Sequence, residues 1–230
     1  MSVPTGDSDE NPYNFSIQGT GTDTALKLWL KLNETSGTNA DDTSGNNLDG
    51  TLTNGPVWSG SALSFDGSND VVTLGNPSAL QITGAMTLSA WVNIDTFNNG
   101  RIIAKQGGST DRGWSLNVES GSYAAMQISD SSNVIIYANS ATLSTGVWVH
   151  LVGVYEPGSA VRIYVNGSQS GSDTTGIPAS QRNSSQNVNV GRRPDSASNT
   201  WFDGLIDDVR VYNRALSAAE ATVMFNNGRQ

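Results

Sequence analysis

Apolar and polar residues alternate over many short stretches of this chain, which is the pattern of β-strands with one buried face. The alternation is strict in residues 26–32, 87–94, 113–118 and 147–155. Shorter segments with strand character occupy residues 62–66, 70–74, 101–106, 123–129, 133–138, 160–165 and 187–191. Turn dipeptides such as Asn166-Gly167 separate them. Many short strands without intervening helices predict an all-β fold, in which two antiparallel sheets pack as a jelly-roll sandwich.

The chain carries one clear helix signal, near its C-terminal end. Ser217 and Glu220 form an S-x-x-E capping box, in which each side chain bonds the other residue's backbone N–H. Apolar residues follow up to residue 225, and Asn227-Gly228 is typical of a helix end. The sandwich is therefore predicted to carry one short C-terminal helix.

Residues 1–24 differ from the rest of the chain, which we treat as one domain spanning residues 25–230. Tyr13, Phe15 and Ile17 alternate with polar neighbours as a single strand would, and one strand is not stable alone. The segment resembles the closing strand of the immunoglobulin-like domains of large bacterial surface proteins. It is interpreted as a tail or stump of such a preceding module, or equally as an edge strand of the main domain.

Charge and composition exclude several function classes. The chain has 12 Lys and Arg against 21 Asp and Glu, so its formal net charge is −9. Such an acidic surface repels nucleic acid and anionic lipid, and favours cations and neutral polar ligands. The absence of cysteine excludes disulfides, thiolate metal sites and cysteine nucleophiles. No apolar run is long enough to insert into a membrane, and residues 1–14 lack signal-peptide character.

The closing segment, residues 201–217, places two acids side by side on a predicted strand. Strict alternation puts Asp207 and Asp208 on opposite faces, each among apolar neighbours. A buried acid needs a cation or hydrogen-bond donors. This segment therefore raises the question of a metal ion.

Five segments in the expected order carry a family resemblance. They are residues 61–72, 87–92, 148–155, 162–167 and 202–217. Together they resemble the bacterial laminin-G-like, concanavalin-A-like jelly-roll domains of the lectin and glucanase superfamily, over roughly residues 25–228. The resemblance implies the jelly-roll fold. It leaves function open, because such domains act as lectins, carbohydrate-binding modules, adhesion modules and spacers.

The resemblance also implies a structural calcium ion beside the closing strand. Calcium takes six to eight oxygen ligands from carboxylates, carbonyls and water. The predicted ligands are Asp42, a carbonyl around Asn47, and one of Asp207 and Asp208. In the alternative interpretation, Asp42 caps a turn while the two acids pair with Arg210, Arg214 or backbone donors. A zinc site is disfavoured by the single histidine and the absence of cysteine.

Catalysis is not expected. Glucanases that share this fold resemble one another in an E-x-D-x-x-E strand, and this chain has only isolated glutamates. A serine triad would need His150, the sole histidine, which lies within a predicted strand as a structural histidine does.

Sugar recognition needs aromatic faces together with amide, carboxylate and guanidinium groups. The candidate ligand-binding residues are Asp111, Arg112, Gln127, Tyr137 and Trp201, each of which has a solvated or packing role as its alternative. The sequence thus predicts a non-catalytic, lectin-like module that binds a polysaccharide or glycan. It would belong to a larger secreted or cell-surface protein, with that chain's other domains as partners. The alternative is an adhesion or spacer module that contacts protein partners without binding glycans.

Overall fold

Two antiparallel sheets lie face to face in the computed structural model, which describes residues 23–195 and 200–230. The proposed stump at residues 1–24 lies almost wholly outside the described residues. Sheet A follows the order β14 (Ser168–Asp173), β13 (Ala160–Val165), β12 (Trp148–Glu156), β7 (Met86–Thr96), β16 (Asp203–Tyr212), β5 (Leu63–Asp66) and β4 (Val57–Trp58), and β1 (Leu26–Leu30) also pairs with β16. Sheet B follows the order β11 (Ile135–Asn139), β10 (Tyr123–Ser129), β9 (Trp114–Glu119), β8 (Arg101–Lys105), β15 (Asn189–Val190), β6 (Val71–Thr73), β3 (Gly50–Thr53) and β2 (Asn39–Ala40).

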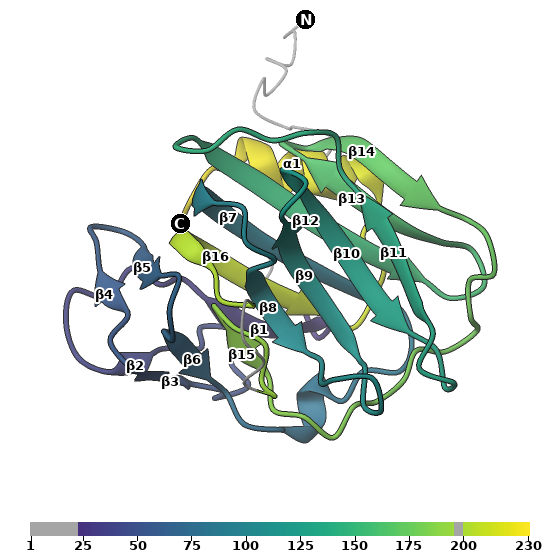
Figure 1. The fold of residues 1–230 in the computed structure, drawn as a ribbon, viewed down its shortest axis with the longest axis horizontal. Helices are drawn as coiled ribbons and strands as arrows, with labels where there is room; N and C mark the ends of the chain where they lie inside the picture. The colour runs from purple at the N-terminus through teal and green to yellow at the C-terminus, as the bar shows by residue number, and fades with distance from the viewer. Residues whose placement is uncertain (1–22, 196–199) are drawn as a thin grey trace, which may run out of the picture.

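The predicted jelly-roll sandwich is confirmed. Figure 1 looks onto sheet B, with β8, β9, β10 and β11 in front of β7, β12 and β16. One apolar core fills the space between the sheets, and it includes Leu88, Val92, Trp114, Leu116 and Ile163. Trp114 is only 1% exposed, as its alternation with polar neighbours predicts.

The sequence pattern misses four short strands: β2, β3, β4 and β14. β14 has the sequence SQSGSD, which has no apolar side chain to mark a buried face. It exists because β13 pairs with it across the Asn166-Gly167 turn, where Asn166 has a φ of 50°. A short turn that allows left-handed backbone fixes this pairing without any hydrophobic signal.

The alternation predicted for the closing strand is wrong at one point. The pairing of β16 with β7 shifts between Asp207 and Arg210, and Asp208 has a φ of 51°. This is a β-bulge, in which one extra residue bends the strand. Ile206 and Val209 therefore both lie in the core, and Asp207 and Arg210 lie on the outer face.

Helix α1 (Ala218–Asn226) covers the outer face of sheet A. Its capping box is present as predicted: the Ser217 side chain accepts from Glu220 N, and the Glu220 side chain accepts from Ser217 N. Ala221 packs against Val152 and Tyr164 of sheet A. No described helix has the length and apolar character needed to span a membrane. A 3₁₀ turn, η1 (Ser78–Leu80), precedes β7.

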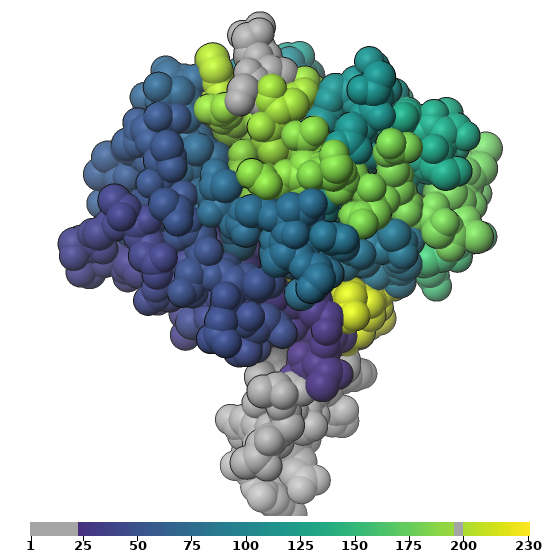
Figure 2. Space-filling view, turned by 90° about the horizontal axis from the view of Figure 1, so that it is seen from below, coloured from purple at the N-terminus to yellow at the C-terminus, as the bar shows by residue number. Residues whose placement is uncertain are grey.

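The first and last described parts of the chain lie side by side, as the purple and yellow surfaces of Figure 2 show. Asn213 donates its backbone N–H to the carbonyl of Ala25 over 2.9 Å. In register, Leu30 of β1 lies opposite Val209 of β16. The strand that comes last in the chain is therefore central in sheet A, between β7 on one side and β1 and β5 on the other.

Candidate functional site

A continuous row of mostly polar residues crosses the outer face of sheet B. Their neighbours in sequence, such as Met126, Leu116 and Val190, belong to the core, so alternation points the row outward. In register order across seven strands, the row is Tyr137, Gln127, Ser115, Ala104, Asn189, Thr73 and Thr51. Tyr137 is 51% exposed. The face that carries this row points toward the viewer in Figure 1.

Two residues of this row, Ser115 and Gln127, belong to a network of hydrogen-bonded side chains. Gln106 Nε2 donates to Gln127 Oε1 over 3.4 Å, and Arg101 Nε donates to Gln106 Oε1 over 3.3 Å. Glu119 Oε1 accepts from Asn117 Nδ2 at 2.6 Å and from Gln127 Nε2 at 3.1 Å. Because each side chain restrains the next, little rotamer freedom remains to be lost when a ligand binds.

Ser115 completes the network, which we call the sheet B network and which comprises Arg101, Gln106, Ser115, Asn117, Glu119 and Gln127. The Ser115 hydroxyl donates to Asn117 Oδ1 over 3.0 Å. Within this network, Arg101 Nη1 lies 3.9 Å from Glu119 Oε1. Burial lowers the pKa of the Arg101 guanidinium, and the Glu119 charge opposes that effect. Within the network, Arg101, Gln106, Ser115 and Asn117 are buried, whereas Glu119 and Gln127 are half-buried. The groups that a ligand can reach are therefore one carboxylate and one amide, both of which bind hydroxyls.

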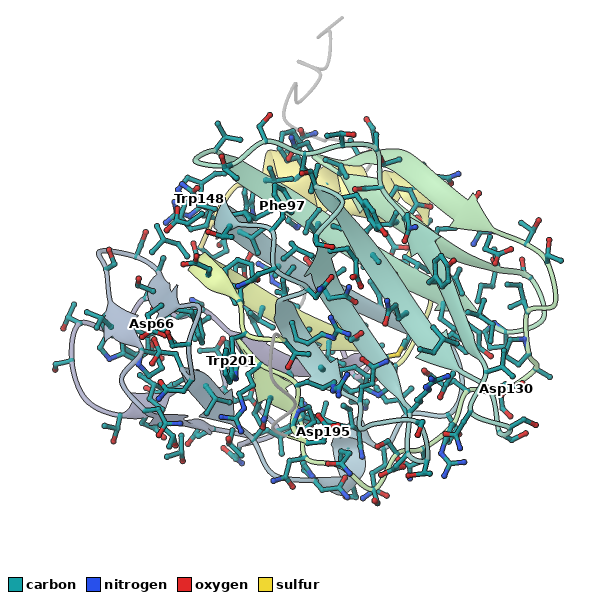
Figure 3. All side chains as sticks on the ribbon, in the orientation of Figure 1. Asp66, Phe97, Asp130, Trp148, Asp195 and Trp201 are labelled. Carbon is teal, nitrogen blue, oxygen red and sulfur yellow. The ribbon has the colours of Figure 1, made fainter. Side chains whose placement is uncertain are left out.

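Trp201 is brought alongside β8 by backbone contacts. It forms a β-bridge with Arg192, and Arg101 N donates to the carbonyl of Thr200 over 3.2 Å. Gly100 permits this approach, since a Cβ there would lie 2.8 Å from the Trp201 carbonyl oxygen. The half-buried Trp201 ring lies toward the β15 side of the molecule (Figure 3), and its Nε1 has no hydrogen-bond partner among the described residues.

Asp111 and Arg112 hold loops together at the margin of the same face. The Asp111 carboxylate accepts from the Ser185 hydroxyl at 2.7 Å and from Gln186 Nε2 at 3.2 Å. Burial acts to raise the pKa of Asp111, but these hydrogen bonds outweigh it and lower that pKa. Arg112 Nη1 donates to the carbonyl of Asn133 over 2.9 Å, and the Arg112 carbonyl accepts from Ser129 on β10.

The structure thus brings Gln127, Tyr137 and Trp201 to one face, with Arg112 at its margin. Reasoning from sequence missed Arg101 and Gln106, together with Ser115, Asn117 and Glu119. The last three alternate with core residues in the strand sequence WSLNVE. That alternation was the signal that could have identified them.

The carboxylates among the predicted metal ligands, those of Asp42, Asp207 and Asp208, make other contacts. Asp42 accepts four hydrogen bonds, from Trp29 N at 3.0 Å and from Ser44 N, the Ser44 hydroxyl and Leu48 N at 2.9 Å each. Both oxygens of Asp42 are therefore filled by protein donors. Asn47 has a φ of 56° within this turn.

Asp208 and Asp207 each face a guanidinium. Asp208 accepts both nitrogens of the Arg210 fork at 2.9 Å each, and it also accepts Trp29 Nε1 at 2.6 Å. Asp207 accepts Arg229 Nε at 2.6 Å. Trp29 therefore bridges the loop and the closing strand, through its backbone N–H to Asp42 and its indole N–H to Asp208.

This donor set does not fit a calcium cage, because the lone pairs of Asp42 are already taken and Asp208 lies against a guanidinium. In the described part of the chain, no group of three or more His, Cys, Asp or Glu side chains is placed to hold a metal. The contacts of these residues match the alternative interpretation, in which Asp42 caps a turn and the two acids pair with arginines. Asp208 pairs with Arg210 as that interpretation expects, and Asp207 pairs with Arg229, which it did not include. Calcium stays a prediction from the sequence.

His150 lies in a buried polar pair. Its Nε2 is 3.0 Å from the Ser89 hydroxyl, while its Nδ1 has no partner among the described residues. Burial lowers the pKa of His150 to about 3, with the Arg210 charge adding to the effect. The residue is 1% exposed, beneath Trp91 and Phe225. A Ser–His pair closed to solvent and lacking a carboxylate at Nδ1 does not have the geometry of a catalytic triad.

Comparison with known proteins gives a match at the family level. A family model described as the concanavalin A-like lectin/glucanases superfamily matches residues 66–222, more than half of the chain. No curated protein sequence matches.

Several solved structures share the fold at low sequence identity. The binding domain of Paraclostridial Mosquitocidal Protein 1 is 16% identical, with a TM-score of 0.67, covering 88% of this chain and 52% of its own. The binding domain of Botulinum neurotoxin DC, solved in complex with rat synaptotagmin II, is 16% identical with a TM-score of 0.64. The match covers 90% of this chain and 52% of the neurotoxin chain. A structure of the same domain in complex with SialylT is 15% identical with a TM-score of 0.63, and the match again covers 90% of this chain and 52% of the neurotoxin chain. The chain thus spans about half the length of these structures.

Proposed function

Because the chain belongs to the concanavalin A-like lectin/glucanase superfamily, we propose that it is a non-catalytic carbohydrate-binding module. Its ligand surface is the outer face of sheet B. The observation that carries this proposal is the sheet B network, with the exposed ring of Tyr137 on one side and Trp201 on the other. Hydroxyls of a glycan would bond Glu119 and Gln127, the half-buried members of the network, while the apolar C–H faces of the glycan pack on the rings.

Two features support the assignment. The similar structures are binding domains, and one was solved in complex with SialylT. The Ser–His pair of sheet A is buried, and the sequence lacks the paired acids of glucanases. We further propose that the module acts outside the cell or on its surface, as part of a longer secreted chain. The structural calcium ion predicted from the sequence is a separate question, which chelation tests.

A second function has one observation in its favour. Another of the similar structures was solved in complex with a protein, rat synaptotagmin II. An adhesion or spacer module that contacts proteins is therefore the alternative, and the same experiment separates the two.

A glycan array followed by affinity electrophoresis on soluble polysaccharides tests the proposal. Glu119→Gln and Tyr137→Ala are each expected to weaken retention about tenfold, equivalent to about 1.4 kcal/mol. Val57→Ala is the matched control, since Val57 is exposed on sheet A, and should leave retention unchanged. No binding across a broad panel, with calcium present, would favour the adhesion or spacer function.

A further inference from the structure

The outer face of sheet A holds a guanidinium in a well-defined setting. The side chain of Arg229, which follows α1, returns onto this face. Its Nε donates to Asp207 Oδ2 over 2.6 Å, and its Nη2 donates to the Ser61 hydroxyl at 2.6 Å and the Ser61 carbonyl at 3.1 Å. The guanidinium carbon lies 3.7 Å from the centre of the Trp148 ring. Aromatic, carboxylate, hydroxyl and carbonyl groups thus all contact one planar cation.

The groups around this cation belong to the sandwich itself. Asp207 lies on β16 and Trp148 on β12, with β7 between them; Trp91 is opposite Asp207, and Asn93 is opposite Trp148. Ser61 precedes β5. Figure 3 shows Trp148 at the other end of the molecule from Asp195 and well separated from Trp201. This setting is therefore distinct from the sheet B network.

Asp207 is unusual in its burial. Its side chain is 0% exposed, and only one of its two oxygens is paired. Oδ1 has no hydrogen-bond partner among the described residues. A buried carboxylate needs paired charge and hydrogen bonds, and the bulge of β16 places this one where the cation arrives. Oδ1 is therefore an unused acceptor inside the site.

The chemistry selects guanidinium over other cations. A planar fork offers several N–H donors in one plane and stacks its face on an aromatic ring, whereas a lysine ammonium is a compact, strongly hydrated point charge. The stacking face of Trp148 and the edge-on acceptors of Asp207 and Ser61 match the first geometry.

We infer that Trp148, Asp207 and Ser61 form a guanidinium-binding site, which Arg229 fills in cis and which an arginine side chain of a peptide partner fills when Arg229 withdraws. Arg229 engages only Oδ2 of Asp207. An arginine that approaches without the constraint of the α1 connection can engage both oxygens, which gives the competing ligand its advantage. The site is independent of the proposed glycan-binding face.

Arg229→Gln empties the site while keeping the chain length. The probes are acetyl-Gly-Arg-Gly-amide and, as the matched control, acetyl-Gly-Lys-Gly-amide, titrated calorimetrically. We expect saturable binding of the arginine peptide to the variant, about tenfold weaker binding of the lysine peptide, and about tenfold weaker binding of the arginine peptide to the unaltered chain. Adding Trp148→Ala should abolish binding, and retention on glycans should not change.

A folded Arg229→Gln chain that binds neither peptide, or binds both equally, would overturn the proposal. If that variant does not fold, the unaltered chain is titrated with the arginine peptide while the Nε–H resonance of Arg229 is followed by NMR. The resonance should move to the position of a solvent-exposed arginine as the peptide saturates the site. A resonance that stays in place at high peptide concentration overturns the proposal as well.

Discussion

His150 should make the protein less stable as the pH falls. The imidazole is buried and neutral in the folded protein, with its pKa lowered from 6.5 to about 3 by burial and by the charge of Arg210. In the unfolded chain it takes up a proton below its ordinary pKa. Stability is therefore complete above about pH 6.5 and is lost progressively toward about pH 3, because the unfolded state binds more protons across that range.

The magnitude follows from the two pKa values. Between about pH 7 and about pH 5, the His150 proton stabilises the unfolded state by about 2 kcal/mol. Asp207, two strands away, acts in the opposite direction, because burial raises its pKa to about 6 against the opposing effect of Arg229. On acidification the Asp207 carboxylate is protonated in the folded protein before it is protonated in the unfolded chain. This adds about 1.3 kcal/mol to the free energy of unfolding over the same pH interval. The unaltered protein should thus lose only a fraction of a kcal/mol.

The perturbation is His150→Gln, which removes the titrating group and keeps a hydrogen-bonding partner for Ser89. Urea unfolding followed by tryptophan fluorescence gives the free energy of unfolding at both pH values. Asp207 is present in both proteins, so the difference in their pH dependence reports His150 alone. The variant should become more stable on acidification, and the two proteins' changes should differ by about 2 kcal/mol. Equal pH dependence in both proteins would refute a buried, neutral His150.

Three further predictions concern stability. Gly191→Ala should lower the free energy of unfolding by about 3 kcal/mol or more, because the added Cβ would lie 2.2 Å from Phe65 Cε1 at a φ of +87°. Gly176→Ala is the control for backbone strain alone, since Gly176 has a φ of +62° and open space around it. Equal losses of stability in the two variants would contradict the clash with Phe65. Trp29→Phe should lower the free energy of unfolding by about 1–3 kcal/mol, because the buried carboxylate of Asp208 loses its indole donor, and an unchanged urea midpoint would contradict that contact. Excess chelator should shift the melting temperature by less than about 1 °C, because protein donors fill the acidic loop; a fall of several degrees, which ion binding would produce, would instead support the calcium predicted from the sequence.

The sequence predicted most of the sandwich because each strand buries only one face. Apolar and polar residues then alternate along the strand, and this alternation is visible in the sequence. Trp114 and its apolar neighbours follow that pattern directly. The bulge of β16 was not predictable, since it depends on one aspartate, Asp208, in a left-handed conformation that any short polar residue could adopt. The polar strand β14 lacked a hydrophobic signal altogether.

The candidate site was predictable only in part. Gln127 and Tyr137 could be placed on the outer face because each alternates with apolar, buried neighbours in its strand. Glu119 and Arg101 sit at strand ends, where charged residues are common, and only the pairing of β8 with β9 brings them together. Asp111 contacts Ser185, 74 residues away, so its role in joining two loops could not be inferred from local sequence.

The pairing of β1 with β16 has a consequence for how the chain folds. Leu26, near the start of the described chain, lies opposite Tyr212 near its end. During synthesis, β1, β5 and β7 are made before β16, the strand that pairs with all three. Until β16 is made, the backbone groups at these strand edges have no partner from it. Contacts so distant in sequence are formed slowly and leave sheet edges exposed to other chains. We therefore expect slow refolding, and aggregation of any nascent chain that stops before β16.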